Sequence, residues 1–244
     1  MFKLVFSCLV FALLFCAHPA AAFVPDDEEL AALLHKSYGP LASWEADMTF
    51  PAHPGVSVNI LYARGKWRQQ WRAGDAAQAV GVAGTVVSAC TGGPFPLSPL
   101  FVWMVPNPLE SWRAWGVDVA PRSYGFYGDA PCIMLGADPG DDASPAIYLD
   151  NEDMAPLLVR YRADGRLIAV EYADYMTLGG FRLPQKVVLT VDGETLEASV
   201  KWRSVMKSGD GKLYARDAIP SLPCAEPPAP FGFLRDNFRY PSTR

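Results

Sequence analysis

The stretch from Ala155 to Arg203 constrains the fold most, because two Asp-Gly pairs separate its alternating apolar runs. These pairs, Asp164-Gly165 and Asp192-Gly193, are typical of two-residue type I′ turns, which need positive φ at both central positions. Turns of this kind fix the register of the strands that they join. The stretch therefore predicts four consecutive antiparallel strands.

The predicted register sorts the side chains of this meander onto two faces. Leu189 faces Leu196 across the second turn, and Val159 faces Val170 across the first. The opposite face carries charged residues: Arg160, Arg162 and Glu171. An apolar face opposed to a charged one is typical of an antiparallel sheet with a single buried side.

The first 22 residues read as a targeting segment. Lys3 precedes the apolar run from Leu4 to Phe15, and Ala20 to Ala22 supply small residues for cleavage. This pattern predicts a secretory signal peptide over 1–22, with cleavage after Ala22 and a periplasmic or secreted mature chain. A retained membrane anchor and lipid attachment at Cys16 are the alternatives.

The rest of the chain fits one domain over 23–206, followed at 207–244 by a final strand and a Pro-rich tail. Asp26 to Tyr38 predicts a helix, because acidic residues fill its first turn and Gly39-Pro40 ends it. Further strands are expected at Ser43–Phe50, Val56–Tyr62, Lys66–Arg72, Ala77–Ala89, Val117–Tyr127, Ala130–Ala137 and Ala146–Asp150. The tally is about ten or eleven strands.

Residues Thr91 to Trp115 form a Pro-rich and aromatic insert. Ser98 before Pro99 and Asn107 before Pro108 each predict the start of a short helix. With so few helices and no βαβ alternation, the fold class is mainly β. One curved antiparallel half-barrel, covered by the N-terminal helix and the insert, is the expected architecture.

Three of the five cysteines lie beyond the predicted signal peptide: Cys90, Cys132 and Cys224. An oxidising compartment favours one disulfide and one free thiol. We predict Cys90–Cys132, since both residues flank expected strands. A bond from Cys224 that ties down the Pro-rich tail is the alternative.

Several kinds of chemistry lack a sequence signature. The net charge of −5 argues against nucleic acid as a partner. His35 and His53 are the histidines beyond the signal segment, and they fit no hydrolase or metalloprotease motif. The acidic runs at Asp138–Asp142 and Asp150–Asp153 are interpreted as polar turns rather than metal sites. No cofactor, no metal and no catalytic residue are therefore predicted.

Three short stretches resemble the lipoprotein-localisation family of LolA and LolB. They are Arg64-Gly65-Lys66-Trp67-Arg68, the hairpin from Asp164 to Asp174, and Leu213 to Pro220, which resembles the family's final strand. A fourth, the step Gly180 to Pro184, resembles broader families of LolA-like periplasmic proteins. The family's Pro is absent from the first stretch, and the Trp-rich insert is a further departure. The resemblance implies a half-barrel that holds acyl chains between sheet and helices.

This resemblance implies a non-catalytic periplasmic carrier in lipoprotein sorting or transport, with lipid or acylated lipoprotein as ligand and envelope membrane proteins as partners. The residues expected to contact acyl chains are Leu100, Phe101, Trp103, Met104, Leu109, Trp112, Trp67, Trp71 and Val200. Arg64 and Arg68 are expected to hold the cover or to contact a lipid head group. All of these residues also fit an ordinary packed core.

Two other functions are consistent with the same sequence. A structural or interaction module of the cell envelope would fill the sheet with its own side chains and leave no ligand cavity. An envelope hydrolase would need a clustered acid, base and nucleophile, and the sparse histidines disfavour it. The size and lining of any cavity between the sheet and the Pro94–Trp115 segment separate these hypotheses.

Overall fold

The computed structural model describes residues 24–73, 75–206, 211–219 and 223–241. The predicted signal peptide, 1–22, lies outside the described residues. Twelve strands form one antiparallel sheet: β1 (Ser43–Thr49), β2 (Ser57–Ala63), β3 (Lys66–Ala73), β4 (Asp75–Val82), β5 (Thr85–Ala89), β6 (Arg122–Tyr127), β7 (Ala130–Leu135), β8 (Ala146–Asp150), β9 (Pro156–Ala163), β10 (Arg166–Leu178), β11 (Phe181–Val191) and β12 (Glu194–Met206).

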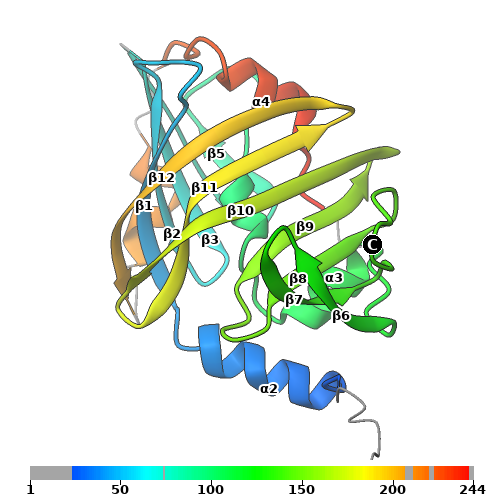
Figure 1. The fold of residues 1–244 in the computed structure, drawn as a ribbon. Coiled ribbons are helices and arrows are strands. Elements are labelled where there is room, and N and C mark those ends of the chain that lie inside the picture. The colour runs from blue at the N-terminus through cyan, green and yellow to red at the C-terminus, as the bar shows by residue number, and fades with distance from the viewer. Residues whose placement is uncertain (1–23, 74, 207–210, 220–222, 242–244) are drawn as a thin grey trace, which may run out of the picture.

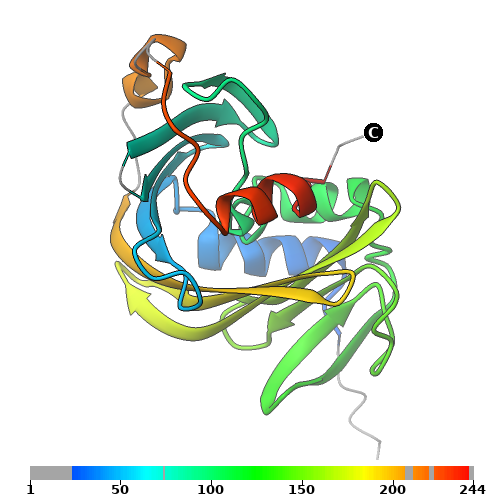
Figure 2. The same cartoon turned by 90° about the horizontal axis from the view of Figure 1, so that it is seen from above.

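The sheet is an open, curved layer, as the sequence predicts. Its strand order runs from β5 back to β1, crosses to β12, and then runs back to β6, so that β5 and β6 form the two edges. Figure 2 shows the sheet curving around the helices, which lie on its concave side. A sheet this long buries its apolar face by curling over other elements.

The meander predicted from the two Asp-Gly turns is confirmed. Asp164 and Gly165 have φ of 51° and 78°, and Asp192 and Gly193 have 51° and 84°. The register follows, with Leu189 opposite Leu196. Positive φ at both turn positions matches the right-handed twist of the flanking strands, which is why this pairing is fixed locally.

Three predicted helices form where their capping residues indicate. The long helix α2 (Asp27–Tyr38) begins with a capping box in which the Asp26 carboxylate accepts from the Glu29 amide. The insert holds a 3₁₀ helix, η1 (Pro99–Val102), whose first turn donates to Ser98 Oγ. It is followed by α3 (Pro108–Ala114), which begins after Asn107 in the left-handed region, at φ 49°.

Several predicted boundaries are wrong. The strand expected at Ala77–Ala89 is the β4–β5 hairpin, in which the turn residue Ala83 has φ 46° and the register shifts at Gly81. Of Val117–Tyr127 only β6 is a strand. The final strand expected at Leu213 to Pro220 is replaced by two 3₁₀ helices, η2 (Gly211–Tyr214) and η3 (Arg216–Ala218).

The tail contains a helix that the sequence analysis missed, α4 (Phe231–Asn237). Its Phe231 and Leu234 are fully buried in the main core, and the red helix in Figure 2 lies across the concave side of the sheet. The tail, for which the sequence predicted no helix, thus contributes to the core. The Pro-rich stretch before α4 hides this helix, because only three apolar side chains in α4, those of Phe231, Phe233 and Leu234, indicate a buried face.

A second, smaller apolar cluster lies apart from the main core. It consists of Cys132, Met134, Ala146, Tyr148, Leu157 and Leu158. Beside it Arg160 is 4% exposed, and its Nε donates to the carbonyl oxygen of Ser144 at 2.6 Å. The expectation that Arg160 belongs to a solvated charged face is therefore wrong, since this side chain holds the 138–145 loop.

Candidate functional site

The concave face beneath the insert is filled by aromatic side chains. Trp67 is fully buried and stacks on Phe101, with ring centroids 5.2 Å apart. Trp71 is equally buried, stacks on Phe50 at 5.6 Å and meets the edge of Phe231 at 5.2 Å. Aromatic pairs in these geometries stabilise a core beyond the area that they bury. The sheet and the insert are thus in direct contact here.

Eight of the nine residues predicted to contact acyl chains belong to the buried core: Leu100, Phe101, Trp103, Leu109, Trp112, Trp67, Trp71 and Val200. Only Leu109, which is 8% exposed, and the partly buried Met104 also line an open groove. The structure therefore moves the candidate binding surface from beneath the insert to the side of it. Side chains buried in a core reach no ligand without being displaced.

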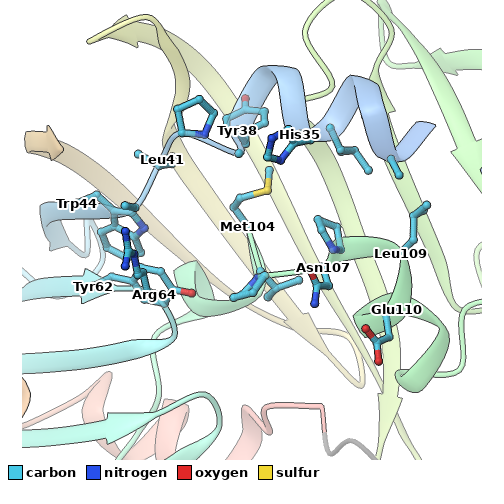
Figure 3. A pocket seen from close by; sticks show the side chains of 18 of the residues that line it. His35, Tyr38, Leu41, Trp44, Tyr62, Arg64, Met104, Asn107, Leu109 and Glu110 are labelled. Atoms are coloured by element: carbon cyan, nitrogen blue, oxygen red, sulfur yellow. The ribbon is translucent and has the colours of Figure 1, made fainter. Parts of the chain in front are cut away.

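This groove has a volume of about 920 Å³ and runs between α2 and the segment from Met104 to Arg113. Figure 3 shows it from close by: His35 and Tyr38 come from α2, Trp44 and Tyr62 from β1 and β2, and Met104, Asn107, Leu109 and Glu110 from the insert. Ligand sites in proteins commonly measure 300–1,000 Å³ and are mostly apolar. The groove fits both criteria.

One wall of the groove is a single face of α2, formed by residues spaced three to four positions apart. Ala31, Leu34, His35 and Tyr38 line it, as residues on one helical face must. Tyr38 holds the end of this wall, because its hydroxyl donates to the carbonyl oxygen of Arg182 at 2.9 Å. Burial raises the pKa of Tyr38 above its ordinary value, so the phenol stays a neutral donor.

At one end, the floor of the groove is a pair of stacked rings. Trp44 and Tyr62 lie with centroids 5.1 Å apart and nearly parallel planes. Burial raises the pKa of Tyr62 to about 12, which keeps this surface uncharged at neutral pH. Both residues occupy buried positions of their strands. The alternation of buried and partly exposed residues in β1 and β2 is therefore the sequence signal that places their side chains on the inner face.

Arg64 lies at the same end, in the β2–β3 turn. It has φ 48°, followed by Gly65 at 85°, and its backbone N–H donates to the carbonyl oxygen of Ala42 at 3.0 Å. The residue is exposed and lines the groove. Within the described part of the chain, its guanidinium has no ion pair or hydrogen bond, so it remains available to an anion.

Arg68 does not share this position. It alternates with the inward-facing Trp67 and Gln69 along β3, and its Nη2 donates to Gln78 Oε1 at 2.9 Å. The side chain therefore lies on the outer face of the sheet. The prediction that Arg68 contacts the cover is corrected, since strand alternation turns it away.

The other end of the groove is crossed by an ion-pair bridge. The carboxylate of Asp27, in the first turn of α2, accepts from Arg113 of α3 and from Arg122 of β6. Arg122 is 7% exposed in its side chain and also donates to the carbonyl oxygen of Pro25 at 2.6 Å. These contacts fix the N-terminal end of α2 against the insert and the sheet.

The disulfide differs from the predicted pairing. Cys90 bonds to Cys224 with Cα atoms 5.5 Å apart, while Cys132 is a free, buried thiol in the second cluster. Cys90 follows β5 at one edge of the sheet, whereas Cys132 lies on β7 near the other edge. Cys90–Cys132 is therefore wrong, and the alternative that ties down the tail is confirmed.

Two further features bear on chemistry. Over the residues whose placement is described, no group of three or more His, Cys, Asp or Glu side chains is arranged to hold a metal ion. In the same part of the chain, no helix has the length and apolar character needed to cross a bilayer.

Comparisons with known proteins return related folds but no close relative. No family model and no curated protein matches the chain. Among solved structures, it is similar to a LolA superfamily protein from Nitrosomonas europaea, with 11% identity over 80% of this chain and all of that one, at a TM-score of 0.45. A DUF1329 family protein from Desulfovibrio piger gives 11% identity, 78% and 96% coverage, and a TM-score of 0.43.

A third similar structure is a protein domain from Vibrio parahaemolyticus assigned to outer membrane lipoprotein sorting, with 10% identity over 79% of this chain and 99% of that one, at a TM-score of 0.43. The family resemblance drawn from the sequence thus recurs among the solved structures. Similarity at these identities and TM-scores says nothing about the function of this chain.

Proposed function

We propose that this protein is a non-catalytic carrier that binds the apolar chain of a lipid or an acylated lipoprotein in the groove between α2 and the insert. One observation carries the proposal: the groove, of about 920 Å³, is lined largely by apolar side chains from three separate parts of the fold. It is large enough for a ligand and open enough for a head group or polypeptide to remain outside.

The physical reason for such a carrier is the cost of moving an acyl chain through water. Each methylene removed from water contributes about 0.8 kcal/mol, so a chain of about 16 carbons costs on the order of 12 kcal/mol to leave exposed. A concave apolar wall offsets this cost without any reaction. The predicted signal peptide supports the periplasm as the proposed place of action. Envelope membrane proteins are the proposed donors and acceptors of the ligand.

The proposal is tested first on the mature protein purified from the periplasm. Native mass spectrometry is expected to detect co-purified lipid, and a fluorescent fatty-acid probe is expected to bind. Met104→Gln should then weaken probe binding about tenfold, because it places an amide against the apolar chain in the groove.

Leu33→Gln is the matched control for Met104→Gln. Leu33 is on α2 but outside the groove lining, and its side chain is 37% exposed. Its replacement should leave probe affinity unchanged. Equal losses in both variants, or a wild-type protein with neither bound lipid nor probe response, would contradict the carrier proposal.

Arg64 gives a separate prediction about the head group. Arg64→Gln is expected to weaken binding of an ionised fatty acid about fivefold and to leave binding of the corresponding methyl ester unchanged, because only the carboxylate pairs with the guanidinium. Arg68→Gln, on the outer face, should change neither. Isothermal titration with the acid and the ester measures both. A similar loss for acid and ester would remove Arg64 from head-group recognition.

A second candidate function is supported by one observation. The interior beneath the insert is packed with the protein's own aromatic rings, as a structural or interaction module of the envelope would have it. This reading requires that the groove bind no apolar ligand. The probe experiment above therefore decides between the two candidates.

A further inference from the structure

The groove has a continuation along α2. Asp27 lies one helical turn before Ala31, so it extends the stripe formed by Ala31, Leu34 and Tyr38 on the same helical face. A second, shallower hollow of about 630 Å³ begins at this point and is lined by Val24, Pro25, Asp26, Asp27, Glu28, Ala120 and Arg122. The two hollows thus follow each other along one helix.

The Asp27 bridge stands between these hollows. Arg113 lines the groove, Arg122 lines the second hollow, and the Asp27 carboxylate accepts from both. The bridge therefore closes the groove at the end opposite Arg64. A ligand that enters at Arg64 meets charged side chains when its apolar tail has passed Leu34.

We propose that the Asp27–Arg113 ion pair is the closed end of the acyl groove and sets the length of chain that the protein accepts. This inference rests on the carrier function proposed above and adds its specificity determinant. Asp27 and Arg113 are 57% and 48% exposed in their side chains, and ion pairs this exposed are held weakly. Removing either side chain opens the groove into the second hollow.

The expected signature is a change in chain-length preference. Affinity for saturated fatty acids should rise about fourfold per added methylene while the added group is buried. In the wild type the rise should stop once the tail reaches the bridge, because further methylenes remain in water. In Asp27→Ala and in Arg113→Ala the rise should continue to longer chains.

The experiment is competition of a fluorescent fatty-acid probe by a series from eight to eighteen carbons on the mature protein. Glu197→Ala is the matched control, since it removes an exposed ion pair with Lys186, 2.9 Å long, on another part of the sheet. Its profile should equal that of the wild type. Arg113→Ala keeps the Asp27–Arg122 contact, so it remains informative where Asp27→Ala weakens α2.

The outcomes separate the two proposals. The closed end is overturned, and the carrier function left standing, by either of two results in a wild type that binds fatty acids. In the first, affinity stops rising at the same chain length in the wild type and in both bridge variants. In the second, the affinity of the wild type still rises at eighteen carbons. A wild type that binds no acid of any length overturns both. The assignment is supported if affinity stops rising at a longer chain length in both bridge variants, and at the wild-type length in Glu197→Ala.

Discussion

Replacing both Cys90 and Cys224 by serine is expected to lower the free energy of unfolding by about 4–5 kcal/mol. The disulfide spans 134 residues, and closing a loop of that length removes much of the conformational entropy of the unfolded chain. It also holds the tail that places Phe231 and Leu234 in the core. Urea denaturation of wild type and double variant without reductant measures the difference.

Cys132→Ala is the control for the disulfide variant. Cys132 is buried but free, so its replacement removes one sulfur atom from the second cluster and no cross-link. Its cost should be clearly smaller than that of the double variant. Peptide mapping that joins Cys90 to Cys132, or a loss in Cys132→Ala as large as in the double variant, would reject the pairing.

Trp71→Ala is expected to cost about 3–5 kcal/mol of unfolding free energy, as for other fully buried large aromatic residues. Trp71 packs between Phe50 and Phe231, and no atom of it lines the groove. The substitution therefore leaves a cavity that these rings cannot close. Denaturant unfolding gives the free energy, and the same sample is titrated with the fatty-acid probe.

The matched comparison is with Met104→Ala. Met104 is a partly buried groove residue, so this replacement should cost much less stability. The sequence placed Trp71 and Met104 in one ligand-contact set, and the fold separates them. Should Trp71→Ala leave stability unchanged while probe binding is lost, Trp71 would be a ligand contact after all, and the packed-core assignment would be wrong.

The features predicted correctly are those set by neighbouring residues. The type I′ turns at Asp164-Gly165 and Asp192-Gly193 depend on φ at two positions, and they fix the pairing of β9 with β10 and of β11 with β12. The start of α2 depends on Asp26 and Glu29, three residues apart. Such signals are complete within a few residues of sequence.

The site was predicted less well, because its composition depends on what packs against what. Trp67, Gln69 and Trp71 alternate onto one buried face of β3, but a wall buried in a core and a wall that contacts a ligand show the same alternation. Only the position of α2 beside Met104 and Leu109 shows where space remains. Arg64 and Arg68 belong to one short stretch of sequence, yet Arg64 lies in the β2–β3 turn beside the groove and Arg68 lies on the outer face of β3.

The sequence by itself determined an antiparallel meander, its register and the capped start of α2, since turn geometry and side-chain alternation act over short distances. Tertiary structure alone decided that Cys90 meets Cys224, that α4 fills the core, and that the free space lies beside the insert. These depend on contacts between segments far apart in the chain, and no local pattern records which distant surfaces come together.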